Sequence, residues 1–124
     1  DPCTNLEEAY IIGYDPCGGF YPDTTNWEYM KAGGYIVALT ERDDTVATYN
    51  LPDTLFNFPI EYFDDRQYNC YFPRSQWDTY KINVAYKFAS EDEKIVSGCT
   101  TDILMSEFNT ITNNKQIIIQ CVTR

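Results

Sequence analysis

The sequence contains no histidine, which removes the commonest general base and the commonest metal ligand of enzymes. It also contains no C-x-x-C pair, so a zinc site would need thiolates gathered from distant parts of the chain. The G-x-S-x-G and S-x-x-K motifs of serine hydrolases are absent as well. We therefore predict a protein that is not an enzyme and that holds no metal and no other cofactor.

Cationic side chains are scarce, with 9 lysines and arginines against 19 acidic residues and a net charge of −10. This balance argues against nucleic acid and against anionic membranes, because both are bound mainly through lysine and arginine. Acidity of this kind chiefly serves solubility, and the sharper alternative is a docking surface for a basic partner or for calcium. Oxygen ligands do occur together in residues 23–28, but Asx turns explain that loop better than a calcium site does.

No apolar run approaches the roughly 20 residues that cross a bilayer, so no transmembrane span is predicted. The chain opens at Asp1 without a basic and apolar leader. We expect that any signal peptide has been removed and that residues 1–7 form a short tether to the rest of a longer precursor.

The chain has five cysteines, at positions 3, 17, 70, 99 and 121. Two disulfides and one free thiol are the preferred interpretation, and they imply an oxidising compartment. The alternative is a set of buried free thiols that behave as small hydrophobic residues. Cys17 and Cys99 both lie in glycine-adjacent turns after predicted strands, so we predict that these two residues pair.

Alternating apolar residues predict several strands. Residues 34–50 favour an antiparallel hairpin with a four-residue charged connection, Glu41–Asp44. Residues 81–88 alternate most regularly, with Ile82, Val84, Tyr86 and Phe88 on one face. Residues 8–14 and 115–123 predict two further strands, and Gly13 marks a bulge or a close backbone approach. Residues 101–108 favour a short helix, with a loop as the alternative.

About five strands with little helix, in a chain of 124 residues, predict a single all-β domain. A strand, a hairpin, an irregular insertion and two closing strands match a small antiparallel five-stranded barrel of the OB kind. A small β-sandwich is the second choice.

Aromatic residues make up 16% of the chain, and many of them fall in predicted loops. Loops run over the surface, so clustered rings there predict a patch that binds a protein or a glycan. The alternative is that the loops fold down and use the rings as a second small core. The candidate binding residues are Phe20, Tyr21, Trp27, Tyr29, Tyr71, Phe72 and Trp77.

The segments IIGYDPC, GGYIVAL, TYNLPDTLFNFP and YKINVAYKF, taken together, resemble small exported domains of Bacteroidota. The resemblance implies an exported protein of the periplasm, the outer membrane surface or the extracellular space. It also implies lipid anchoring through a cysteine upstream of the chain or at its start, where Cys3 lies.

The sequence thus favours an exported, non-catalytic binding module whose aromatic loops contact a protein or a glycan. Two alternatives stay open. One is a structural component of the cell envelope, and the other is a thiol-dependent redox or metal protein.

Overall fold

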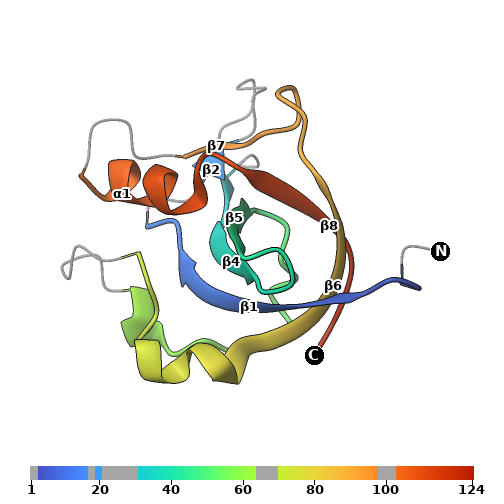
Figure 1. The fold of residues 1–124 in the computed structure, drawn as a ribbon. Helices are drawn as coiled ribbons and strands as arrows, with labels where there is room; N and C mark the ends of the chain where they lie inside the picture. The colour runs from blue at the N-terminus through green and yellow to red at the C-terminus, as the bar shows by residue number, and fades with distance from the viewer. Residues whose placement is uncertain (1–2, 17–18, 21–30, 64–69, 98–102) are drawn as a thin grey trace.

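The computed structural model describes residues 3–16, 19–20, 31–63, 70–97 and 103–124. Its main element is a closed barrel of five strands (Figure 1). The barrel strands are β1 (Glu7–Tyr14), β4 (Tyr35–Leu39), β5 (Asp44–Thr48), β6 (Lys81–Phe88) and β8 (Gln116–Thr123). All five strands were predicted from runs of β-forming residues, either alternating or, at residues 117–119, consecutive, with bounds within two residues of those observed.

Around the barrel the strands follow the order β1-β4-β5-β8-β6. Numbered by their place along the chain, this is the order 1-2-3-5-4 of an OB barrel, so the predicted fold class is confirmed. One detail differs from the prediction of an antiparallel barrel. β5 and β8 pair in parallel, through Ala47 with Gln116 and Thr48 with Ile117, which makes the barrel mixed.

The parallel contact is short, and side chains extend it. Asn50 accepts a hydrogen bond from the Ile119 amide at 3.0 Å and donates one to the Ile119 carbonyl at 3.0 Å. Lys115 pairs with Asp44 at 3.0 Å where the two strands begin. These contacts replace the backbone ladder that two diverging parallel strands cannot make.

Both faces of the hairpin β4–β5 are covered. Val37 and Val46 point into the barrel, whereas Ile36 and Ala47 point outward and are at most 1% exposed. The helix α1 (Ile103–Thr112) lies against this outer face and buries Phe108 there. The helix was predicted at residues 101–108, and in the structure it extends further, to the two asparagines with positive φ that follow it.

Outside the barrel, β2 (Gly19–Phe20) pairs with β3 (Lys31–Ala32) and with β7 (Val96–Ser97) in a small separate sheet. β2 belongs to the connection between β1 and β4, and β7 belongs to the connection between β6 and β8. The connection between β1 and β4 and the connection between β6 and β8 are therefore joined by backbone pairing.

Gly13 fills both roles that the sequence suggested. The register of β1 against β4 shifts between Ile11 and Gly13, which marks a bulge. The segment that carries Cys70 pairs with the strand here in an antiparallel bridge of Gly13 with Tyr71, and the Tyr14 amide donates to the Cys70 carbonyl at 2.8 Å. A Cβ on Gly13 would lie 2.4 Å from that carbonyl oxygen, so this close approach requires glycine.

The described residues of the irregular region between β5 and β6 include two 3-10 helices, η2 (Ile60–Phe63) and η4 (Arg74–Tyr80). Its rings pack on one another and on the barrel interior in T-shaped and tilted contacts. The alternative that the aromatic loops form additional core holds for this region. Phe72, predicted as a binding residue, is 1% exposed in that core, so its assignment to a surface patch is wrong.

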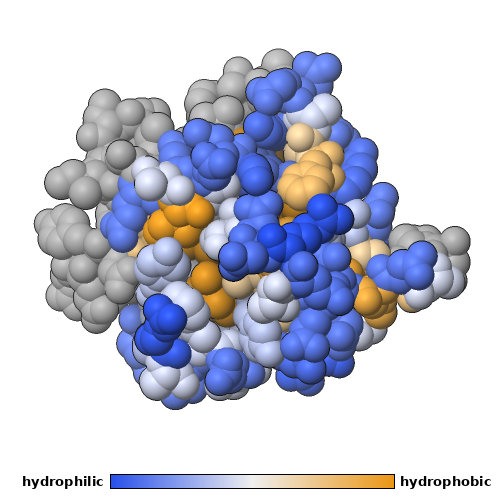
Figure 2. All heavy atoms as spheres, in the orientation of Figure 1, coloured by the Kyte–Doolittle hydropathy of each residue, from blue (hydrophilic) through white to orange (hydrophobic). Residues whose placement is uncertain are grey.

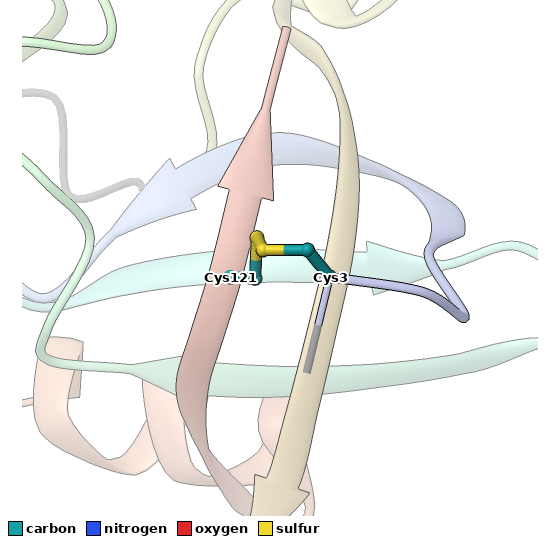
Figure 3. Close-up of a disulfide and its surroundings, with 2 residues drawn as sticks. All are labelled: Cys3 and Cys121. Atoms are coloured by element: carbon teal, nitrogen blue, oxygen red, sulfur yellow. A yellow bond between two sulfur atoms is a disulfide. The ribbon is translucent and has the colours of Figure 1, made fainter. Parts of the chain in front are cut away.

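A disulfide joins Cys3 to Cys121 of β8 and so ties the residues before β1 to the fifth strand of the barrel (Figure 3). Neither cysteine had been assigned a partner from the sequence. Because Cys3 is bonded to Cys121, it is not free to carry a lipid, and an anchor would need a cysteine further upstream. Cys70 lies outside the disulfide and is fully buried, which does not suit a reactive thiolate.

The predicted pair Cys17 and Cys99 lies outside the described residues. Two described features support the prediction. Cys3, Cys121 and Cys70 account for the other three cysteines. In addition, β2 and β7, which lie within two residues of the two cysteines in the sequence, pair with each other through Gly19 with Ser97 and Phe20 with Val96.

We therefore expect one alkylated cysteine per chain when the unreduced protein is labelled in denaturant, and peptide mapping should place the label on Cys70. Prior reduction provides the control and should give five labels. Three labels without reduction would show that Cys17 and Cys99 are not bonded to each other.

Candidate functional site

OB barrels typically bind ligands on the outer face of their second and third strands, flanked by the connections 1–2 and 4–5. Here those strands are β4 and β5, and α1 covers their outer face. Ile36 and Phe108, which meet there, are 0% and 2% exposed. A ligand site on the described surface must therefore lie elsewhere on the barrel.

A pocket of about 330 Å³ opens beside the turn between β4 and β5. We call it the Arg42 pocket. Four separate parts of the chain line it: the residues that lead into β1, the β4–β5 turn, the second half of β6, and β8. Its lining residues are Thr4, Asn5, Glu7, Arg42, Val84, Ala85, Tyr86, Phe88 and Gln120. The volume lies at the lower end of the range for small-molecule sites.

Local backbone features place these side chains. Tyr86 and Phe88 follow Val84 on the inward face of β6. At these two positions, Arg42 of the β4–β5 turn lies beside the strand. The register between β6 and β8 shifts after Ala85, which leaves Gln120 as an extra residue on β8 that faces the pocket. The disulfide holds Thr4 and Asn5 nearby, because Cys3 and Cys121 directly adjoin Thr4 and Gln120.

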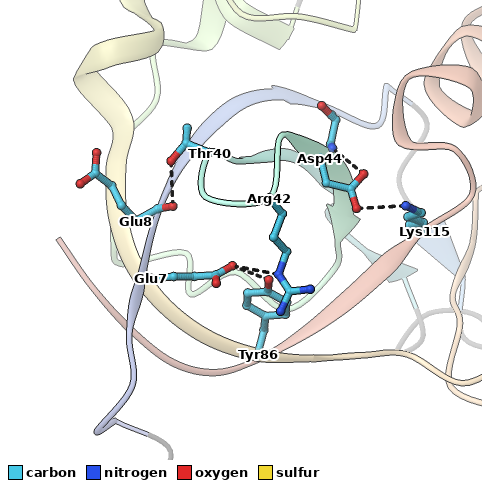
Figure 4. Close-up of polar contacts among 8 residues, drawn as sticks. Glu7, Glu8, Thr40, Arg42, Asp44, Tyr86 and Lys115 are labelled. Atoms are coloured by element: carbon cyan, nitrogen blue, oxygen red, sulfur yellow. Dashed lines mark hydrogen bonds and ion pairs between the residues drawn. The ribbon is translucent and has the colours of Figure 1, made fainter.

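The turn that carries Arg42 is fixed on both sides. The Thr40 hydroxyl donates to the Glu8 carbonyl at 3.2 Å, and Asp44 pairs with Lys115 (Figure 4). From this turn the Arg42 side chain reaches across to Glu7 and Tyr86. Its guanidinium carbon lies 5.8 Å from the ring centroid of Tyr86 and 5.8 Å from that of Phe88.

Glu7 provides the negative charge of the pocket. The Tyr86 hydroxyl donates a hydrogen bond to the Glu7 carboxylate, and Arg42 Nε lies 3.7 Å from the same oxygen. Burial, together with the hydrogen bond and the charge of Glu7, raises the pKa of Tyr86 to about 12. The phenol therefore stays protonated at physiological pH and keeps donating to Glu7.

Hydrophobic side chains reach the face shown in Figure 2 as separate spots among hydrophilic ones. In the described part of the chain, two large hydrophobic side chains are prominently exposed, Ile60 at 84% and Phe88 at 44%. Phe88 therefore combines exposure with membership of a pocket. Its edge-on contact with Tyr86, with ring centroids 5.8 Å apart, gives the pocket an aromatic wall.

Two residues of the predicted aromatic patch lie together in the structure. The rings of Tyr71 and Trp77 are 5.3 Å apart, and the guanidinium of Arg74 covers Trp77 at 4.4 Å. Both rings are partly buried against the hydrophobic cluster outside the barrel that contains Ile36 and Phe108, and the Trp77 indole donates to the Phe72 carbonyl at 2.9 Å. This pair is therefore largely engaged within the protein.

The remaining candidates of the patch, Tyr21, Trp27 and Tyr29, lie outside the described residues, and for Phe20 only the backbone is described. The loop at residues 23–28, considered for calcium, also lies outside them. In the part of the chain that is described, no group of three or more metal-ligating side chains occurs. No described helix is long and apolar enough to span a bilayer.

Sequence reasoning did not assign Glu7, Arg42, Tyr86 or Phe88 to a site. One signal was present in the sequence: the alternation of β6 continues past the buried Ile82 and Val84 to two more aromatic residues. The pairing of β6 with β1 ends at Val84, so the rings that follow on the inward face need another cover on that side. That cover is the Arg42 side chain.

Comparisons with protein-family models, with curated proteins and with solved structures find no match for this chain. The assignment to an OB-type barrel therefore rests on strand order and pairing alone.

Proposed function

We propose that this chain is an exported, non-catalytic binding module that takes a segment of a partner protein into the Arg42 pocket. The observation that carries the proposal is the pocket itself, in which an exposed aromatic ring adjoins a carboxylate, an arginine and side-chain amides. Aromatic rings and arginine are the groups that most often dominate the binding energy of protein interfaces.

The lining of the pocket supports binding rather than catalysis. Glu7 is its one carboxylate, whereas acid–base hydrolysis of glycosides uses two. The lining contains no cysteine and no serine, and its one threonine has no lysine or histidine beside it in the lining to act as a base. What the pocket offers is an aromatic surface and fixed hydrogen-bonding groups.

Export is supported by the disulfide between Cys3 and Cys121, because such bonds persist in oxidising compartments. The net charge of −10 favours a partner with basic segments, since opposite charge speeds association. A glycan is the other ligand class that suits an aromatic wall with amides. The net charge favours a protein partner, and the experiment below also tests for glycan binding.

Peptides selected from a random displayed library on the wild-type protein should lose at least about tenfold in affinity when Phe88 is replaced by alanine, because an aromatic contact residue contributes 1–2 kcal/mol. Ile60→Ala is the matched control, since Ile60 is also exposed but does not line the pocket, and this variant should retain affinity. Titration calorimetry measures both affinities, and thermal unfolding checks that both variants fold.

Equal affinity for the two variants would place the peptide site outside the pocket. If soluble oligosaccharides shifted the amide resonances of pocket residues and no peptide did, the ligand would be a glycan and not a protein. A pocket that responds to neither class would overturn the proposed function.

A further inference from the structure

Glu7, Tyr86 and Phe88 surround the guanidinium group of Arg42 on three sides, and we call these three residues the guanidinium cage. The guanidinium carbon lies 5.8 Å from each ring centroid, within the roughly 6 Å over which a cation is attracted to an aromatic ring. The carboxylate of Glu7 faces the same group (Figure 4). Two rings and one acid are the groups that recognise an organic cation.

Arg42 contacts Glu7 and the Tyr86 hydroxyl, but its side chain remains half exposed. Its Nε lies 3.7 Å from the Glu7 oxygen, which exceeds the distance of a hydrogen bond. The Arg42 side chain is 54% exposed, and ion pairs of this kind contribute little to stability. The backbone of the turn is fixed by Thr40 and Asp44, so the side chain can leave the cage without a change in the fold.

The cage itself does not depend on Arg42. Tyr86 holds the Glu7 carboxylate by a hydrogen bond. The rings of Tyr86 and Phe88, two residues apart on the same face of β6, contact each other. The other lining residues are uncharged, and Asn5 and Gln120 each present an amide oxygen that can accept a hydrogen bond. Without Arg42, the pocket would hold one negative charge and no positive one.

These observations point to one ligand chemistry. We propose that the guanidinium cage binds an arginine side chain from a basic segment of the partner protein, in exchange with Arg42. Arg42 is then an internal competitor that keeps the two rings and the carboxylate covered until a partner arrives. The inference rests on the proposed function and names the group that the partner supplies. The charge of the whole chain, −10, favours the approach of such a segment.

The test replaces Arg42 with glutamine and uses N-acetyl-arginine amide as the probe. In the wild type the probe can bind only during the fraction of time in which Arg42 is out of the cage, and its apparent affinity is lowered by that fraction. R42Q should therefore bind the probe at least about fivefold more tightly than the wild type. Arg74→Gln is the matched control, because it removes the same charge from another arginine that covers a ring outside the pocket. Amide chemical shifts in NMR titrations give both affinities and the site.

N-acetyl-citrulline amide has nearly the same shape without the charge and should not bind R42Q at the same concentrations. Adding Glu7→Gln to R42Q should remove most of the gain in affinity for the arginine probe. Equal affinities of R42Q and R74Q, or equal binding of citrulline and arginine, would overturn the inference.

The two proposals fail in different ways. Selected peptides that contact the pocket but tolerate the replacement of every arginine would overturn the guanidinium cage and leave the binding module intact. Failure of all peptides to contact the pocket would overturn both.

Discussion

Replacing Gly13 with alanine is expected to lower the free energy of unfolding by about 2–4 kcal/mol, because an added methyl group meets atoms that cannot give way. A Cβ at this position would lie 2.4 Å from the Cys70 carbonyl oxygen and 2.8 Å from Ile36 Cδ1. The first contact is with the backbone, so the clash can be removed only by moving the whole segment around Cys70. The bonds from Tyr14 to Cys70 and from Phe72 to Ile12 would weaken together. Urea denaturation measures the loss.

Gly33→Ala is the matched control for Gly13→Ala. No heavy atom lies within 4 Å of a Cβ built on Gly33, so its replacement should change the stability by no more than about 0.5 kcal/mol. If Gly13→Ala lost as little stability as Gly33→Ala, the segment around Cys70 would not pack tightly on β1.

Replacing both Cys3 and Cys121 with serine is expected to cost about 3–5 kcal/mol, because the bond closes a very long loop in the unfolded chain. The two residues are 118 positions apart, and the entropic stabilisation grows with the length of the closed loop. Guanidinium denaturation of the double variant measures the loss. The same variant also releases Thr4 and Asn5 from one wall of the Arg42 pocket, so its affinity for the selected peptides should fall as well.

Cys70→Ala serves as the control for the disulfide variant. It removes a buried sulfur without cutting a covalent link, and it should cost about 1 kcal/mol and leave peptide affinity unchanged. If the double serine variant lost no more stability than Cys70→Ala, the bond between Cys3 and Cys121 would contribute little to the fold.

Short runs of β-forming residues, most clearly those with period-two alternation, were enough to predict the barrel strands. In residues 81–88 the apolar side chains at alternate positions give both the strand and its inward face. The hairpin was equally readable, and its loop is four residues long, with Leu39 opposite Asp44. Asp43 adopts a positive φ in that loop, which shows how the chain reverses without glycine.

Features that depend on contacts between residues far apart in the chain could not be predicted from the sequence. The parallel contact of β5 with β8 depends on Asn50 and on Lys115, whose roles appear only when the two strands meet. The pairing of Cys3 with Cys121 likewise follows from barrel closure and not from any local signal. The Arg42 pocket is built from four separate segments, and the one local signal, the aromatic residues that continue the alternation of β6, does not show which other segments meet it.

The position of β8 in the barrel also sets the order in which the protein can fold. β8 follows every other barrel strand in the sequence, yet it fills the gap between β5 and β6. Before it docks, both neighbours present unpaired backbone edges, and the nucleus of folding must bring together segments far apart in the chain. Such topologies fold slowly, in milliseconds to seconds, and their intermediates are prone to aggregation. We expect that a chaperone which shields strand edges would raise the folding yield.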